Sequence, residues 1–509
     1  MSLEYHIPFF TIFIPMITAL IINIVRNNKA TKYIAILSLL SVLVLDIIMV
    51  RFMSVNQVDT FTYMLGHFPA PWGNELKTGQ LEIALNLAFS LVMILSVLGG
   101  SRSLLDDVAE DKHYIYYIMV CMTFASISVL TYTNDIFTSY VFIEINTIAA
   151  CSIVVLKETG ETVRATLKYF IMSSIGSGIY LFAISTLYGI TGHLLMEPMH
   201  KSIVNLVSTG QYMFPLTASL ILILAAIGIK SALFPFHNWL PDAHGSATSS
   251  SSAILSALVL KGYIVLFVKI LYRVYGMEVI RQLNILPVIL ALGLMGMIFG
   301  SIFALFQTEL KKMIAYSSVA QIGYIFTGIG LGTPAGLAAA MFHILTHAFT
   351  KSGLFLVSGS MIHETHNKKI SKMNGIGALM PITMTVFIIG GLSMIGIPPS
   401  IGFSSKWYFS QAMLSSDFVW VVLLLLLSSL LNAAYYLPIV IKGFFSDEYV
   451  ELKKQGKRLE RPILELLPVM VLSFVVITVG LYSTPIYRKA CGPGETTRHY
   501  GLRHIWTQK

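Results

Sequence analysis

Charged residues are scarce in this chain: Asp, Glu, Lys and Arg together make up 12% of its 509 residues, whereas hydrophobic residues make up 55%. The mean hydropathy is correspondingly high, at +0.75. Apolar runs of about 20 residues recur from one end of the chain to the other, and each is long enough to cross the hydrocarbon core of a bilayer. The scarcity of charge argues against a soluble domain and predicts an all-α polytopic membrane protein.

Cysteine is scarcer still. Cys121, Cys151 and Cys491 have no metal-ligand spacing, and two of them lie in apolar runs, which argues against a disulfide framework and a zinc site. The sequence also lacks a phosphate-binding loop, a haem or iron–sulfur motif and a nucleophile–base arrangement. We therefore expect no cofactor in this chain. The net charge of +9 resides in short loops between apolar runs, so it indicates orientation in a membrane and no nucleic-acid partner.

The apolar runs predict about fourteen membrane spans. These cover roughly residues 7–25, 31–50, 80–100, 113–132, 135–156, 166–190, 214–238, 249–272, 284–306, 311–331, 335–360, 381–412, 418–441 and 463–484. A loop rich in proline and glycine, 51–80, is expected at the interface. The first run lacks a basic region and a cleavage site, so we expect it to be retained. Lys and Arg gather in the odd-numbered loops, which predicts that these loops are cytoplasmic and both termini lie outside.

The seventh and twelfth predicted spans each combine a lysine with a proline interruption. Lys230 lies in an apolar run five residues before Pro235, and Lys406 follows Pro398 and Pro399. A proline inside a span frees a backbone carbonyl, and such a break is tolerated where protein or water covers it. An ionisable group beside a break is a functional hypothesis by default, because lipid does not compensate for its charge. We therefore predict that helices 7 and 12 are broken.

A faint internal repeat links these two spans. The tripeptide Ile-Gly-Ile at 227–229 is followed after ten residues by Trp239, and the same tripeptide at 395–397 is followed at the same interval by Trp407. The two copies lie five helices apart, and an odd number of helices inverts the second copy. Paired broken helices in corresponding positions mark the ion site of many transporters.

Other titratable residues lie at membrane depth. Glu144 is near the middle of the fifth span and Lys261 near the middle of the eighth, while His343, His347 and Lys351 follow one another at intervals of four in the eleventh. That spacing places the last three on one helical stripe. A carboxylate close to a buried lysine favours its charged form, so withdrawing Glu144 from Lys230 would release a proton. Proton transfer along such a row is the chemistry that these residues predict.

Structural roles are the alternative for each of these groups. Asp46 and Lys269 lie towards span ends, where they are expected to reach the interface. His237 and His244 are expected to approach the aqueous face, where an ordinary polar contact would suffice. A lone histidine such as His343 is more often a packing residue, although its series with His347 and Lys351 weakens that interpretation. Glu144, Lys230 and Lys261 could likewise form a purely structural ion pair.

Four segments resemble one family of membrane proteins. They are PFHNWLPDAH at 235–244, HILTHAFTKSGLFLVSG at 343–359, TELKKMIAYSSVAQIG at 308–323 and GHFPAPWG at 66–73. They resemble motifs of the antiporter-like subunits shared by respiratory complex I, Mrp-type Na+/H+ antiporters, and membrane-bound hydrogenase and sulfane reductase complexes. The last segment resembles the D-type branch of Mrp. Thr248 departs from the pattern, because the family usually has proline there at the start of the eighth helix.

The resemblance implies fourteen helices with two inverted five-helix repeats. The corresponding division is 1–112 for helices 1–3, 113–276 for the first repeat, 277–445 for the second repeat, and 446–509 for helix 14 with a polar tail. By motif position it also implies roles in a proton relay. Glu144 and Lys230 would be the input pair, Lys261, His343 and His347 the central relay, and Lys406 the exit, with Lys351 and His237 as further candidates.

The function implied is that of a proton-translocating, antiporter-like subunit of a multisubunit energy-converting complex, with coupling to Na+ left open. The subunit would be non-catalytic by itself and driven by a redox partner. Expected partners are further antiporter-like or small membrane subunits, lipid and a peripheral redox arm, in a prokaryotic inner membrane. Three alternatives remain: a D-type Mrp subunit without redox activity, an independent transporter of an organic substrate, and a structural subunit whose charges only hold helices together.

Overall fold

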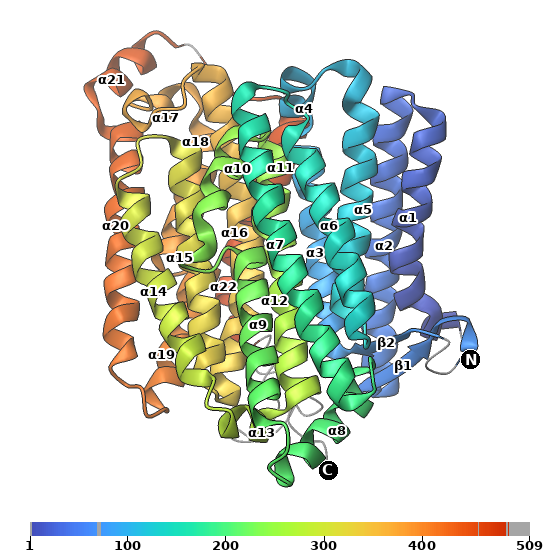
Figure 1. Cartoon of the computed structure of the whole chain (residues 1–509). Helices are drawn as coiled ribbons and strands as arrows, with labels where there is room; N and C mark the ends of the chain where they lie inside the picture. The colour runs from blue at the N-terminus through green and yellow to red at the C-terminus, as the bar shows by residue number, and fades with distance from the viewer. Residues whose placement is uncertain (1–2, 69–72, 457, 485–486, 488–509) are drawn as a thin grey trace.

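The computed structural model describes residues 3–68, 73–456, 458–484 and 487 as a bundle of helices, most of which run roughly parallel to one another (Figure 1). Within these residues, eleven helical segments are long and apolar enough to cross a membrane. They agree with the predicted polytopic, mainly helical membrane protein. The motif at 66–73, Cys491 and most of the polar tail lie wholly or partly outside the described residues.

The helices follow the order of the apolar runs. In the first half they are α1 (Ile7–Val25), α2 (Asn28–Asn56), α3 (Gln80–Gly99), α4 (Ser101–Asp107), α5 (His113–Tyr132), α6 (Ile136–Val155), α7 (Gly160–Thr191), α8 (Met196–Ser208), α9 (Met213–Ser231), α10 (Leu240–Ser246), α11 (Ser249–Ile254) and α12 (Leu260–Lys269). In the second half they are α13 (Met277–Gln282), α14 (Leu286–Leu305), α15 (Leu310–Gly330), α16 (Pro334–Thr365), α17 (Ile376–Leu379), α18 (Pro381–Ile395), α19 (Ile401–Leu414), α20 (Val421–Phe445), α21 (Asp447–Lys454) and α22 (Ile463–Leu481).

Short helices of other types complete the bundle. Five are 3₁₀ helices: η1 (Leu3–His6), η2 (Leu65–His67), η3 (Glu110–Lys112), η4 (Phe236–Trp239) and η7 (Ile370–Lys372). Two are π-helical and flank α12: η5 (Leu255–Val259) and η6 (Ile270–Tyr275). The eighth predicted span is therefore one helical rod, from α11 to η6, whose winding changes on either side of Lys261. π-helical turns inside α-helices occur frequently at functional sites.

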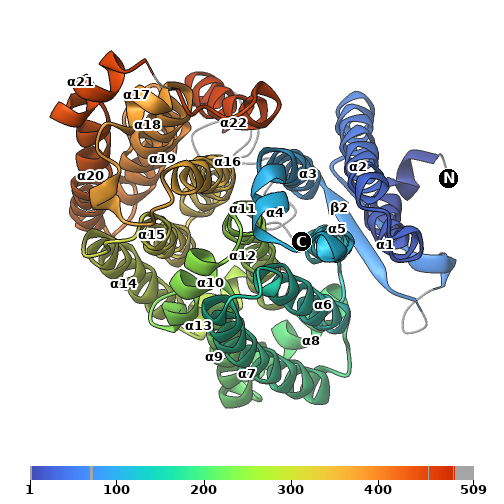
Figure 2. The same cartoon turned by 90° about the horizontal axis from the view of Figure 1, so that it is seen from above.

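A long helix at the centre of the bundle is more polar than a helix that faces lipid. α16 is 32 residues long and packs against α3, α11, α15, α18, α19 and α22 (Figure 2). Because protein surrounds it, its histidines and lysine are not exposed to hydrocarbon, and polar groups at membrane depth are tolerated in such a place. The position of α16 explains why it is absent from the eleven apolar segments, although the sequence predicts a span there.

The segment between α2 and α3 is more ordered than the predicted loop. α2 continues to Asn56, and strands β1 (Thr60–Met64) and β2 (Glu75–Gly79) form an antiparallel hairpin in which Thr60 pairs with Gly79. A further β-bridge joins Leu76 to Thr133, at the turn between α5 and α6. The prediction of a loop was wrong here, because proline and glycine content does not reveal strand pairing with a distant turn. The hairpin lies at the same end of the bundle as α8 and α13 (Figure 1).

Two charged residues assigned to the interface are instead buried. Asp46 is fully buried, and the Asn86 side chain donates to both of its carboxylate oxygens at 3.0 Å. Lys269 is 3% exposed and donates to the carbonyls of Thr131 at 2.8 Å and Thr133 at 2.5 Å, where α5 ends. The prediction that these groups reach the interface was wrong, because each finds a polar partner on a helix far away in sequence. The carbonyl end of a helix favours a cation, which accounts for Lys269.

Glycines allow α14 and α15 to pack closely. A Cβ atom on Gly323 would lie 2.2 Å from the backbone nitrogen of Met297, and one on Gly293 would lie 2.4 Å from that of Thr327. Neither backbone can retreat without moving its whole helix. Close approach of two backbones through small residues is a common way in which membrane helices associate.

Gly323→Val is expected to reduce the yield of folded protein sharply, because overpacking of a tight contact costs about 1–3 kcal/mol. The matched control is Gly178→Val on α7, where a Cβ meets nothing within 4 Å. Fluorescence-detected size-exclusion chromatography of the two variants in detergent measures the effect. Equal yields of the two variants would contradict the close-packing explanation.

Candidate functional site: a row of buried lysines and histidines

Two interrupted helices approach the middle of the bundle. α9 ends at Ser231, Ala232 takes a left-handed conformation, and the chain resumes in η4 and α10. α18 ends at Ile395, Gly396 is again left-handed, and α19 begins at Ile401. Both interruptions predicted from the prolines are therefore present. Each leaves carbonyl groups at a helix C-terminus without an intrahelical partner.

The tryptophans of the repeat do not occupy equivalent environments. Trp239 is buried, donates its indole N–H to the carbonyl of Ile229 at 3.0 Å and stacks on Tyr169. Trp407 is 53% exposed on α19. At the second break the carbonyl of Ile395 is bound by the Lys406 ammonium instead. The two breaks thus share a backbone feature but satisfy their carbonyls with different side chains.

Lys230 lies in the last turn of α9, where the helix C-terminus favours a cation. It is 1% exposed, and its ammonium donates to the Thr147 hydroxyl on α6 at 2.7 Å. Glu144 lies one turn away on the same helix as Thr147 and acts electrostatically on Lys230, but no ion pair within 4.0 Å joins the two. One carboxylate oxygen of Glu144 is buried without a hydrogen-bond partner. Glu144 and Thr147 thus share one face of α6. Thr147 contacts the Lys230 ammonium of α9 directly, and Glu144 lies further from it.

Two tyrosines that the sequence analysis did not select border this pair. The Tyr263 ring on α12 is 6.0 Å from the Lys230 ammonium. Its buried hydroxyl lies near the hydroxyls of Thr147 and Tyr169 but forms no hydrogen bond with either. Tyrosine in an apolar run carries no charge signal, so only the folded arrangement reveals these hydroxyls next to the lysine.

Lys261 occupies the centre of the row, between the two π-helical segments. It is fully buried, and its ammonium donates to the carbonyl of Ser256 in η5. The Ser256 hydroxyl in turn hydrogen-bonds that of Ser318 on α15 at 3.0 Å. A backbone carbonyl of η5 therefore binds the buried cation directly.

The stripe on α16 faces this lysine as the interval of four predicts. His343 is hydrogen-bonded through Nδ1 to the Ser405 hydroxyl at 2.8 Å and through Nε2 to the Gln321 side chain at 3.1 Å. Its ring stacks at 6.5 Å on that of His347. Both ring nitrogens of His347 are buried without a hydrogen-bond partner, and the ring is within electrostatic range of Lys261.

Lys351 ends the stripe and has the most hydrogen-bond partners of its three members. Its ammonium donates to the Ile314 carbonyl at 2.8 Å and to the hydroxyls of Ser317 at 2.6 Å and Tyr436 at 3.4 Å. It is fully buried and lies within electrostatic range of His347. Through these contacts Lys351 holds α16 to α15 and α20. The same contacts are compatible with a lysine that exchanges protons.

Lys406 lies at the second break. Its ammonium donates to the carbonyls of Met394 at 2.9 Å and Ile395 at 2.8 Å, and to the Ser429 hydroxyl at 2.8 Å. It also lies 5.1 Å from the centre of the Tyr324 ring, which packs against His343. The carbonyls left free by the broken helix therefore bind the terminal lysine directly.

The two histidines of the PFHNWLPDAH segment differ in position. His237 is 8% exposed and packs among the rings of Phe234, Phe303 and Tyr316, apart from the residues of the row. His244 is fully buried on α10, stacks on Phe355, and has neither ring nitrogen hydrogen-bonded. The prediction that His244 approaches the aqueous face was wrong, because α10 packs against α15 and its histidine against a ring of α16. It lies within electrostatic range of His347.

The departure at Thr248 has a local explanation. Its hydroxyl accepts a hydrogen bond from the backbone N–H of Ser251 at 3.2 Å, so it is the N-cap of α11. Threonine is a favoured N-cap residue. The helix that carries Lys261 therefore begins properly without the expected proline.

The buried groups of the row are mainly basic. Those 6% exposed or less are Lys230, Lys261, His343, His347, Lys351 and Lys406, and Glu144 is half-buried. They extend from one helix break to the other, through α6, α9, α12, α16 and α19. No group of three or more His, Cys, Asp or Glu residues that could hold a metal ion occurs within the described part of the chain. Lysine and histidine side chains, each of which can bind and release a proton, are the titratable groups available here.

Comparisons with known proteins agree with this arrangement. Residues 133–432 match the family described as "NADH:quinone oxidoreductase/Mrp antiporter, TM". The chain is 31% identical to an NADH-quinone oxidoreductase subunit N of Desulforudis audaxviator, over 94% of this chain and 97% of that protein. It is 28% identical to a Na(+)/H(+) antiporter subunit of Bacillus subtilis, over 92% and 93%. A chain of the membrane-bound sulfane sulfur reductase, an archaeal respiratory membrane complex, superposes with a TM-score of 0.85 at 26% identity, over 95% and 96%.

Proposed function

Because the chain belongs to the NADH:quinone oxidoreductase/Mrp antiporter membrane family, we propose that it is a proton-translocating, antiporter-like subunit of a multisubunit membrane complex. The observation that carries the proposal is the row of buried basic groups that begins at the α9 break and ends at the α18–α19 break. A membrane protein keeps such costly groups at depth where an ion or a proton moves.

The proposed roles follow from the positions along the row. Glu144 and Lys230 form the input, where movement of the carboxylate alters how firmly the lysine holds its proton. Lys261, His343 and His347 form the central relay, and Lys406 the exit. Lys351 exchanges protons with this relay and also holds α15 and α20 in place. His237 takes no part in the proposal, since aromatic rings enclose it.

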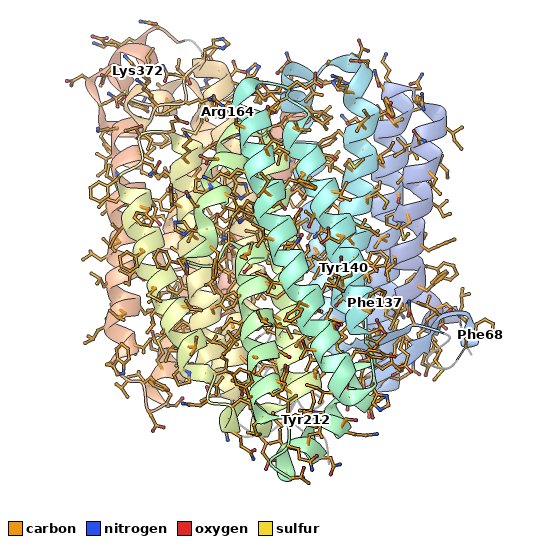
Figure 3. All side chains as sticks on the ribbon, viewed as in Figure 1. Phe68, Phe137, Tyr140, Arg164, Tyr212 and Lys372 are labelled. Atoms are coloured by element: carbon orange, nitrogen blue, oxygen red, sulfur yellow. The ribbon has the colours of Figure 1, made fainter. Side chains whose placement is uncertain are left out.

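The proposal includes the finer topology. Fourteen spans, with 113–276 and 277–445 as inverted repeats between the flanking units 1–112 and 446–509, place the two breaks in corresponding positions. Arg164 and Lys372 lie at one end of the bundle and Tyr212 at the other (Figure 3). The positive-inside rule then assigns the end with Arg164 to the cytoplasm and both termini to the outer side of a prokaryotic inner membrane.

The energy for translocation comes from a partner. The relatives are subunits of larger complexes, some named for NADH-quinone oxidoreductase and one for Na(+)/H(+) antiport. We therefore propose further antiporter-like or small membrane subunits as neighbours, with either a peripheral redox arm or an opposing ion gradient as the driving element. This chain supplies the proton path and needs no cofactor of its own for that role.

Glu144→Gln is expected to slow proton translocation about tenfold, because loss of the carboxylate removes roughly 1.4 kcal/mol of differential stabilisation of the charged lysine. The assay follows acidification of inverted membrane vesicles that contain the assembled complex. Glu278→Gln, at an exposed carboxylate on α13, is the matched control and should translocate normally. Unchanged acidification in Glu144→Gln vesicles, at equal subunit content, would refute the proposed input.

A further inference from the structure

A second buried acidic group lies outside the row, in the N-terminal helices. Asp46 is fully buried on α2, and none of the described Lys, Arg or His side chains forms an ion pair with it. α2 packs against α3 and α5, at the edge of the bundle (Figure 2). A carboxyl group at this depth is costly to ionise, so it is expected to be protonated or to have a cation beside it.

Polar side chains of α3 contact this carboxylate, and one of them connects it to α5. The Asn86 amide on α3 is 3.0 Å from each carboxylate oxygen, and its own oxygen accepts a hydrogen bond from the Ser128 hydroxyl on α5 at 2.9 Å. Ser90, one turn further along α3, is close enough to act on the carboxylate, and its hydroxyl donates to the Leu87 carbonyl at 2.9 Å. Rotating the Asn86 amide by half a turn would direct its oxygen at Asp46.

A polar stripe leads from one end of the bundle to this group. Glu82, Asn86 and Ser90 follow at intervals of four on α3 and so share a face, whereas the next residue on that face is Ile94. Glu82 lies at the hairpin end, where Arg273 is its ion-pair partner. The polar stripe therefore begins at the hairpin end, reaches Asp46, and stops at apolar residues beyond it.

The groups that face Asp46 are few. Tyr132 on α5 lies within electrostatic range of it, Glu82 is the titratable residue of α3, α1 has none, and η1 carries Glu4, Tyr5 and His6. We propose that Asp46, Asn86 and Ser90 form a cation-exchange site that holds either Na+ or a proton, with Ser128 positioning the Asn86 amide. Carboxylate, amide and hydroxyl oxygens are hard ligands suited to such an ion, and a single carboxylate matches a single positive charge.

The exchange balances in charge. With Na+ bound, the Asp46 carboxylate is ionised and the Asn86 oxygen faces it; with a proton bound, the carboxyl is neutral and the Asn86 amide donates to it. One cation leaves as the other arrives. The site deepens the proposed function by naming a second ion, but it shares no residue with the Lys and His row, so the two can fail separately.

Binding of 22Na+ to the purified, intact complex tests the site. The wild-type complex should bind Na+ about tenfold more weakly for each unit of pH below the titration of the carboxyl group, since proton and cation compete by reciprocal linkage. Asp46→Asn, which mimics the protonated form and keeps the fold, should remove one equivalent of bound Na+. Ser128→Ala should weaken binding without removing it.

Asp417→Asn, at an exposed carboxylate between α19 and α20, is the control and should bind Na+ like the wild type. Equal Na+ binding by Asp46→Asn and wild type would overturn the site, as would wild-type binding that does not change with pH. Proton translocation by Asp46→Asn in Na+-free buffer should stay within about twofold of wild type, because the row is intact. Failure of the Glu144→Gln test would instead refute the relay and leave the Na+ result standing.

Discussion

Lys230→Met is expected to reduce proton translocation by the assembled complex to the passive leak of the vesicles. The lysine supplies the ammonium in the last turn of α9, and its partner Thr147 cannot carry a positive charge in its place. A relay that lacks one proton-accepting group must cross the gap by moving an unstabilised charge through a low-dielectric region, and each 1.36 kcal/mol added to a barrier slows the rate about tenfold. The effect should therefore exceed that of Glu144→Gln.

Methionine separates the loss of charge from the loss of packing. Its side chain fills most of the space of the lysine stem, so the variant loses the ammonium group but little packing. The half-buried Glu144 carboxylate then lacks its cationic neighbour, so the subunit content of the complex is measured together with translocation. Lys230→Ala should abolish translocation as well but leaves a cavity. Lys230→Arg keeps a cation and hydrogen-bond donors at this position but should also translocate far more slowly than the wild type, since a guanidinium group does not release its proton.

The control for Lys230 is Lys168→Ala. Lys168 forms an exposed ion pair with Asp242 at 2.7 Å, and such pairs contribute little to stability. Its variant should assemble and translocate like the wild type. Normal translocation by a Lys230→Met complex that contains wild-type amounts of every subunit would end the relay hypothesis. A complex that fails to assemble would support the alternative of a structural subunit instead.

Local signals explain why the row itself could be predicted. A lysine or histidine in an apolar run is conspicuous. A proline indicates a helix break whatever the helix packs against, because its effect on the backbone is local. Lys230, Lys406 and the stripe on α16 could be selected for these reasons before any contact was known. The hydroxyls beside Lys230, those of Thr147 and Tyr263, have no such signal because threonine and tyrosine are common in membrane helices.

Burial was the property that the sequence could not predict. Asp46 and Lys269 lie near the ends of their spans, so distance along the chain suggested the interface. Their partners Asn86 and Thr131 come from other helices, 40 and 138 residues away. The hairpin was missed for the same reason, since β2 pairs with β1 and also with the distant turn between α5 and α6. Long-range pairing decides all three cases, and no short window of sequence contains it.

Glu82→Leu is expected to be the most destabilising single substitution outside the row. Glu82 and Arg273 form an ion pair at 2.5 Å with both side chains 6% exposed. Removing one partner of a buried pair leaves an uncompensated charge and costs about 3–5 kcal/mol. Loss of folded complex on heating in detergent, followed by size-exclusion chromatography, measures the effect.

The two partners should not be equivalent. Lys269 and Lys77 both lie within electrostatic range of Arg273 and Glu82, and Glu82 is the carboxylate that acts on Lys269. Burial also lowers the pKa of Lys77 on the hairpin, so this end of the bundle already holds its cations at a cost. Glu82→Leu leaves the three cations with only Glu75 and Glu197, which act on Lys77, whereas Arg273→Leu keeps Glu82 beside the two lysines. The glutamate variant should therefore unfold at the lower temperature.

The double variant Glu82→Leu/Arg273→Leu distinguishes charge burial from a specific contact. Replacing a buried ion pair by apolar side chains of similar volume is often neutral, so the double variant should recover most of the stability lost by Glu82→Leu. Glu161→Leu breaks the exposed pair with Lys368 and should shift the unfolding temperature little. If the double variant is as unstable as the sum of the single variants, the pair holds α3 to η6 through its geometry. If the double variant recovers its stability, the instability of Glu82→Leu comes from unpaired charge. Glu82 then stabilises this end of the bundle by offsetting the cations around it.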